Sequence, residues 1–175
     1  MKKNISTKEL ASSIGKALEK EGIEAVLVGG SCVSIYSSNK YQSYDLDYIT
    51  YENEKKAIDV LNKLGFVHDS KKYYVHPKCP YFIEFLAPPI SIGNELVNNI
   101  NTIKSRSGII KLLNPTDCVK DRLSAYFYWN DTQSLEQALL VANDQKIDLK
   151  NIEKWAIKED NIEKFNIFLK RLKTL

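Results

Sequence analysis

The stretch that decides the fold is VLVGGSCVSIYSSNKYQSYDLDYIT, residues 26 to 50. It begins with an apolar run that ends in two glycines and a serine, and it closes with a second apolar run that contains Asp45 and Asp47. Residues two apart on a strand share a face and lie about 7 Å apart, so these two carboxylates would repel one another on a half-buried strand. A compensating group is therefore expected beside them.

A divalent metal ion is the simplest compensating group. A third carboxylate, Glu84, lies in the apolar segment YFIEFLA, where it shares a face with two apolar side chains. Carboxylate oxygens are the ligands that hard divalent cations prefer. We therefore predict that Asp45, Asp47 and Glu84 bind Mg²⁺ or Mn²⁺ and carry the chemistry of the site. The alternative is that Asp45 and Asp47 belong to a solvated edge strand, where charges merely prevent aggregation.

The turn after the first strand predicts an anion site. Gly29 and Gly30 let the backbone approach a phosphate closely, and the N–H groups at the start of the next helix attract anions. Ser31 is expected to be the N-cap of that helix, and its hydroxyl would add a donor. The glycine turn followed by two spaced carboxylates indicates a phosphate-containing ligand held beside a metal ion.

Periodicity predicts an α+β fold, in which a small mixed sheet flanked by helices is followed by a C-terminal helical part. We expect residues 1–112 to form the core with an N-terminal helix, and residues 113–175 to form helices packed on it. Within the core, strands are expected near residues 25–28, 45–50, 66–67, 73–75 and 81–87, with helices near 7–20, 31–35 and 53–64.

Composition excludes several classes of protein. The chain has 25 lysines and arginines against 22 aspartates and glutamates, so its charge does not indicate a nucleic-acid partner. Its three cysteines are widely spaced and lack a Cys-x-x-Cys pair, so neither a disulfide framework nor a zinc site is expected. We find no signal-peptide pattern and no apolar run long enough to span a membrane, and we expect a soluble, cytoplasmic protein.

The motif in residues 28–31, thirteen further residues and then Asp45-Leu46-Asp47 resembles the DNA polymerase beta-like nucleotidyltransferase superfamily. The resemblance implies a small mixed sheet flanked by helices, two metal ions, and attack of an acceptor hydroxyl on the alpha-phosphate of a nucleoside triphosphate. Glu84 falls where the superfamily places its third carboxylate, and the resemblance assigns it the role of base.

Within that superfamily, the chain is similar to small bacterial nucleotidyltransferase-like proteins related to abortive-infection and toxin components. The resemblance implies that Lys120, on the helix after the core, contacts triphosphate oxygens, and that Ser43 occupies a position where relatives carry serine or threonine. Relatives also carry an arginine before the two aspartates, where this chain has only Lys40. Lys120 and Arg122 lie two apart on a helix, so they are expected on different faces.

The resulting hypothesis is a metal-dependent nucleotidyltransferase that moves a nucleoside monophosphate to a hydroxyl or amine of an RNA, protein or small-molecule acceptor. The alternative on the same fold is a non-catalytic module that binds a nucleotide or a partner, as a toxin–antitoxin or phage-defence component. Trp129, with Tyr126 and Tyr128, either stacks on a base or belongs to the core.

Overall fold

The computed structural model describes residues 4–69 and 72–175. The helices are α1 (Thr7–Lys20), α2 (Gly30–Tyr36), α3 (Glu54–Lys63), α4 (Pro115–Trp129), α5 (Thr132–Asp144), α6 (Leu149–Lys158) and α7 (Ile162–Leu172). The strands are β1 (Ala25–Val28), β2 (Asp45–Thr50), β3 (Val67–His68), β4 (Tyr74–His76), β5 (Cys79–Leu86), β6 (Ser91–Ile92), β7 (Glu95–Leu96), β8 (Ile100–Ser105) and β9 (Gly108–Leu113).

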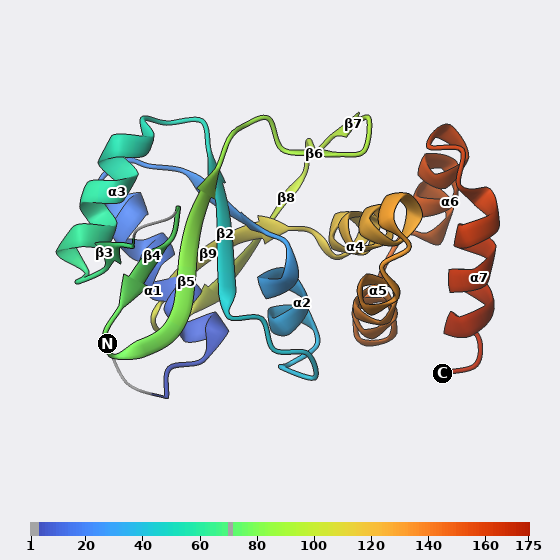
Figure 1. The fold of residues 1–175 in the computed structure, drawn as a ribbon, viewed down its shortest axis with the longest axis horizontal. Helices are drawn as coiled ribbons and strands as arrows, with labels where there is room; N and C mark the ends of the chain where they lie inside the picture. The colour runs from blue at the N-terminus through green and yellow to red at the C-terminus, as the bar shows by residue number, and fades with distance from the viewer. Residues whose placement is uncertain (1–3, 70–71) are drawn as a thin grey trace.

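The described strands form one mixed sheet and a small hairpin. The main sheet has seven strands in the order β3-β4-β5-β2-β1-β9-β8, and β6 pairs with β7 apart from it. Strand β2 runs antiparallel to β1 and parallel to β5, while β1 runs parallel to β9. The mixed sheet with helices around it and a helical C-terminal part confirms the predicted α+β class (Figure 1).

One face of the sheet is covered by α1. On β5, Tyr81 and Ile83 are buried, and the hydroxyl of Thr7 in α1 donates a hydrogen bond to the hydroxyl of Tyr81 at 3.3 Å. Phe82, between them, points to the opposite face and is 40% exposed. The face that carries Phe82 is therefore the more open one near β5.

Two strands of the main sheet, β8 and β9, were not predicted from the sequence, and α1 packs closely against β9. No strand was predicted after residue 87, yet β8 and β9 form a hairpin and β9 lies between β1 and β8, one strand in from the edge of the sheet. A Cβ atom added to Gly15 would lie 2.1 Å from the carbonyl oxygen of Ile109, so only glycine lets α1 approach β9 this closely. The short segment GIIKLL alternates too weakly between apolar and polar residues to predict a strand.

The helices α4 to α7 gather at one end of the molecule (Figure 1). The side chain of Gln145 donates to the backbone carbonyl of Tyr36 in α2 at 2.8 Å, and Lys40 forms an ion pair with Asp144 at 2.7 Å. Four side chains of α4 form a buried stripe and are 8% exposed or less: Val119, Leu123, Tyr126 and Phe127. The helical part thus contacts α2, the helix that follows the glycine turn.

Within the described residues, no helix combines the length and the apolar character that a membrane crossing requires. Cys32, Cys79 and Cys118 are free thiols, and Cys32 and Cys118 are buried.

Candidate active site

The three predicted carboxylates lie along one face of the sheet. In the register of the two parallel strands, Asp47 of β2 lies opposite Glu84 of β5, and Asp45 lies opposite Phe82. Directly paired residues share a face, as do residues two apart on one strand. The sequence pattern alone could not give this register, because Glu84 follows Asp47 by more than thirty residues and a slip of one residue would turn it to the other face.

The glycine turn lies directly against one of these carboxylates. Gly29 is the N-cap of α2 and has a φ of +70°, a conformation that favours glycine. A Cβ atom added to Gly29 would lie 2.8 Å from the Oδ2 atom of Asp47, closer than real contacts allow. The missing side chain is therefore what gives the Asp47 carboxylate its place beside the turn.

Two serines hold the start of β2. The hydroxyl of Ser31 is buried and donates to the backbone carbonyl of Asp45, so the prediction that Ser31 is the N-cap of α2 is wrong. The helix begins one residue earlier because Gly29 adopts the cap conformation without a side chain. The hydroxyl of Ser43 accepts a hydrogen bond from the Asp45 backbone N–H at 3.2 Å and lies next to Gly30. Both serines therefore position Asp45.

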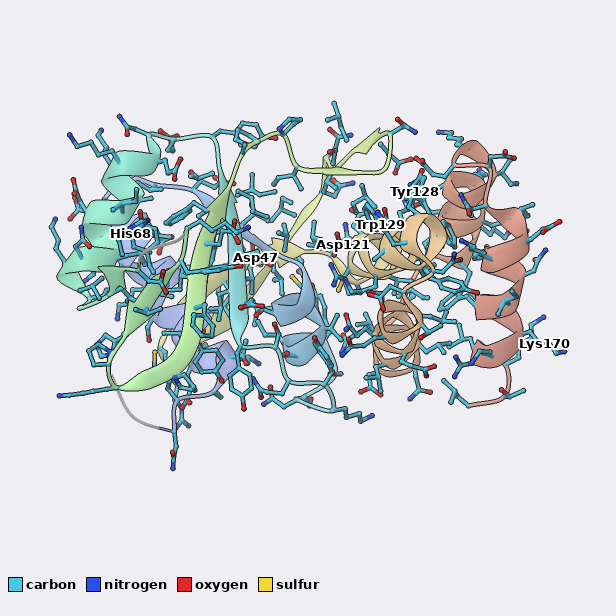
Figure 2. All side chains as sticks on the ribbon, viewed as in Figure 1. Asp47, His68, Asp121, Tyr128, Trp129 and Lys170 are labelled. Carbon is cyan, nitrogen blue, oxygen red and sulfur yellow. The ribbon has the colours of Figure 1, made fainter. Side chains whose placement is uncertain are left out.

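An arginine that the sequence analysis did not assign to the site comes from α4. A Cβ atom at Gly29 would lie 3.9 Å from the Nη2 atom of Arg122, so the guanidinium reaches the same turn as Asp47. Its Nη2 and Nε atoms lie 2.5 Å and 3.0 Å from the Oδ2 atom of Asp121, and Nη1 lies 3.4 Å from the Gln137 side-chain oxygen. Figure 2 shows Asp47 and Asp121 at the junction between the sheet and the helical part.

Lys120 points elsewhere. Its side chain is almost fully buried, and its Nζ atom lies 2.6 Å from Glu95 and 3.6 Å from Asp117. These three residues help to line a polar cavity of about 350 Å³ between β7 and the first turns of α4 and α6. The prediction that Lys120 and Arg122 occupy different faces of one helix is confirmed, and Arg122 is the one that reaches the glycine turn.

Burial and like charge alter the acidity of the central carboxylate. Burial, followed by the nearby carboxylates of Asp45 and Glu84, raises the pKa of the Asp47 carboxyl to about 6. The Arg122 guanidinium acts in the opposite direction. The site therefore carries an excess of negative charge that a bound cation would relieve.

A lysine, Lys72, neutralises part of this negative charge by pairing with Glu84. The Nζ atom of Lys72 lies 2.7 Å from Glu84, whose side chain is 12% exposed, whereas the lysine side chain is 65% exposed. Among the described residues, no three histidine, cysteine, aspartate or glutamate side chains are already grouped closely enough to hold a metal ion. The donor types and their shared face fit a hard divalent cation, and Lys72 has to leave Glu84 before all three carboxylates can reach one ion.

The aromatic residues at the end of α4 separate into two groups. Tyr126 is buried and belongs to the core, which was the second of the two alternatives for these aromatic residues. Trp129 is 75% exposed and Tyr128 is 45% exposed, so neither is a core residue (Figure 2). Sequence periodicity placed Trp129 beside Leu123, but the helix ends at Trp129 and its side chain extends into solvent.

Comparison with solved structures identifies similar folds. The chain is similar to an antigenic nucleotidyltransferase-like protein from Paracoccidioides brasiliensis, with a TM-score of 0.58 and 14% identity over 78% of this chain and 77% of that one. A second similar structure is the antibiotic-resistance factor ANT(2'')-Ia, with a TM-score of 0.48 and 11% identity over 96% and 93% of the two chains. No family model and no curated protein matches the sequence. The fold of this chain is therefore that of nucleotidyltransferase-like proteins.

Proposed function

We propose that this protein is a metal-dependent nucleotidyltransferase that moves a nucleoside monophosphate from a nucleoside triphosphate to an acceptor. The observation that carries the proposal is the meeting of three features on one side of the sheet: three carboxylates in register, a glycine turn in contact with one of them, and an arginine beside both. The nucleotidyltransferase-like fold supports the same reaction class.

The triphosphate would bind at the glycine turn. Gly29 and Gly30 present backbone N–H groups without side chains that would obstruct a phosphate, and the Arg122 guanidinium lies beside them. Asp121 and Gln137 hold that guanidinium in place by accepting its hydrogen bonds. Arg122 thus takes the triphosphate-binding role that the resemblance had assigned to Lys120.

The metal ions would be held by Asp45, Asp47 and Glu84. When bound, Mg²⁺ or Mn²⁺ would neutralise the negative charge that develops on the transferred phosphoryl group. The chain itself places the donors: Ser31 and Ser43 fix the backbone of Asp45, and the register with β5 fixes Glu84 beside Asp47.

The transfer forms one bond and breaks one. The acceptor's hydroxyl or amine attacks the alpha-phosphorus, the bond from that phosphorus to the bridging oxygen of the beta-phosphate breaks, and pyrophosphate leaves with the electron pair. Glu84 would receive the proton that the acceptor loses, because it is the carboxylate farthest from the glycine turn across the sheet and is partly open to solvent. Catalysis would rest on positioning and electrostatics rather than on a covalent intermediate.

A second function is favoured by a specific contact. In this state Lys72 forms an ion pair with Glu84, so a metal ion that binds all three carboxylates has to compete with the lysine for Glu84. A protein that never releases this pair would be a non-catalytic module that binds a nucleotide or a partner protein, such as a toxin–antitoxin or phage-defence component of the cytoplasm.

Calorimetry distinguishes the two functions. Each nucleoside triphosphate is titrated into the parent chain with and without Mg²⁺, and into a chain carrying Asp45→Asn and Asp47→Asn. Asp59→Asn, a surface change on α3, is the matched control. Metal-dependent binding that the double variant loses and the control keeps is the expected result. Labelled triphosphate then reports transfer to candidate acceptors, and equal binding by all three chains would overturn the proposal.

A further inference from the structure

A pair of aromatic rings, one exposed and one half-buried, lies next to the carboxylates on the open face. Phe82, which is 40% exposed, occupies the position on β5 directly opposite Asp45. The ring of Tyr73 meets the Phe82 ring edge to face, with 5.9 Å between the centroids and 61° between the planes. Val75 of β4 lies opposite Phe82 in the antiparallel register and extends the same apolar strip. Stacking on such rings stabilises planar ligands such as nucleobases.

Lys72 joins this strip to the reaction centre. Its Nζ atom lies 2.7 Å from Glu84 and 5.4 Å from the centroid of the Tyr73 ring. Because the side chain is 65% exposed, an anion that binds beside Tyr73 can draw the ammonium away from Glu84 without burying it. A phosphate group is a strong partner for such an ammonium, since it offers several charged oxygens.

We propose that this strip binds the acceptor, and that the acceptor is a free nucleoside monophosphate; the inference rests on the proposed nucleotidyl transfer. The nucleobase stacks on the exposed Phe82 ring, and the phosphate draws the Lys72 ammonium away from Glu84. One of the sugar hydroxyls then faces the carboxylate that must receive its proton. Acceptor binding and the release of Glu84 are therefore one event. Until an acceptor binds, Lys72 stays paired with Glu84, the carboxylate that acts as the catalytic base.

The local charge favours a free nucleotide over a nucleic-acid strand. Between residues 72 and 86, which the structure describes in full, Lys78 is the only lysine or arginine besides Lys72. Lys78 lies in the turn between β4 and β5, six residues before Glu84, which is about 20 Å at the rise of a strand. A strand needs a basic groove that follows its backbone, whereas residues 72–86 place only Lys72 beside the carboxylates, and Arg122 lies across them at the glycine turn. This surface matches a ligand with one phosphate group.

The test measures acceptor binding separately from donor binding. The chain is saturated with Mg²⁺ and an unreactive α,β-methylene triphosphate, and AMP, GMP, CMP and UMP are then titrated by calorimetry. One of the four is expected to bind, and Phe82→Ala and Lys72→Met are each expected to weaken that binding by about tenfold without weakening the triphosphate analogue. Tyr44→Ala, an exposed ring just before β2, and Lys78→Met are the matched controls and should change neither affinity.

The outcomes separate this inference from the function on which it rests. If the triphosphate analogue fails to bind, the proposed function falls and the inference falls with it. If the analogue binds but no monophosphate does, or if the two variants bind the monophosphate like the parent, only the inference is overturned. Binding of a short single-stranded RNA in place of every monophosphate would likewise overturn it and name a strand as the acceptor.

Discussion

The carboxylate of Asp47 occupies the space that a side chain at Gly29 would need. The two residues come from neighbouring antiparallel strands, where Val28 lies opposite Asp47, and the turn after β1 brings Gly29 against the Oδ2 atom. One missing methyl group therefore couples the anion-binding turn to the carboxylate face.

Replacing Gly29 by alanine should displace Asp47 and strain the turn. Gly29→Ala is expected to destabilise the fold by about 1–3 kcal/mol more than Gly22→Ala in urea unfolding. Gly22 is the matched control because it has the same φ of +70° but nothing within 4 Å of an added Cβ atom. The excess should shrink in an Asp47→Ala background, and an excess that persists there would show that strain alone is responsible.

Asp47 should make the protein less stable as the pH rises. Burial raises its pKa to about 6 in the folded chain, whereas the unfolded chain releases the proton near its ordinary pKa of about 3.9. Between these values the unfolded state binds fewer protons, so the free energy of unfolding falls with increasing pH. Asp47→Asn should therefore stabilise the metal-free protein by about 2 kcal/mol at pH 7 and have little effect at about pH 3. A constant difference between the two chains across this range would contradict the assignment.

Arg122 should control both the acidity of Asp47 and the grip on phosphate. Because the guanidinium lowers the pKa of Asp47, Arg122→Met should raise that pKa above about 6, which a carboxyl-detected NMR titration can follow. The same variant should weaken triphosphate binding by at least about tenfold.

Arg122→Lys should restore the charge but not the fork of hydrogen bonds to Asp121 and Gln137, so only part of the affinity should return. Arg106→Met, a change at an exposed arginine on the β8–β9 turn, is the control. If Arg122→Met binds triphosphate as the parent does, the guanidinium has no part in the site.

Removing the amine of Lys72 should open the carboxylate set to metal ions. The hydrogen bond to Glu84 raises the pKa of the Lys72 ammonium, which shows that the two charges stabilise each other. Lys72→Met is therefore expected to tighten Mn²⁺ binding several-fold in calorimetry, because the competing cation is gone. Lys78→Met should leave Mn²⁺ affinity unchanged. Weaker binding in the Lys72 variant would mean that the lysine supports the metal site instead of blocking it.

Glu159 should anchor the β6–β7 hairpin to the helical part. Its side chain is 6% exposed and accepts hydrogen bonds from the backbone N–H of Asn94 at 2.8 Å, from the Asn94 amide at 3.0 Å and from the Tyr128 hydroxyl. Glu159→Ala should lower the free energy of unfolding by about 1–2 kcal/mol, because the exposed Asn94 and Tyr128 lose a charged acceptor but can turn to water. Glu163→Ala, an exposed change on α7, should cost less than about 0.5 kcal/mol.

The sequence predicted the parts of the site that lie close together in the chain. Gly29, Asp45 and Asp47 belong to one continuous segment, in which β1, the glycine turn, α2 and β2 follow one another and spacing alone places them. Arg122 was missed because helical periodicity shows that Lys120 and Arg122 face different ways but not which of them faces the sheet. That choice depends on how α4 docks, which no local pattern contains.

The same limit explains why strand β9 was not predicted. Its residues are short of polar alternation because β9 is flanked by β1 and β8 and covered by α1, so the strand reads like any buried apolar segment. Its position depends on Gly15 and on partners that are distant in the chain.

Because Arg122 lies on α4, the candidate site is divided between the sheet and the C-terminal helices, which can change separately in evolution. The sheet supplies the carboxylates and the glycine turn, and the helices supply the Arg122 guanidinium that lies beside that turn. Substitutions confined to residues 115–172 can therefore retune nucleotide preference while the carboxylate face stays constant. A recombined chain that keeps this sheet and receives another helical cap would be a natural route to a new substrate.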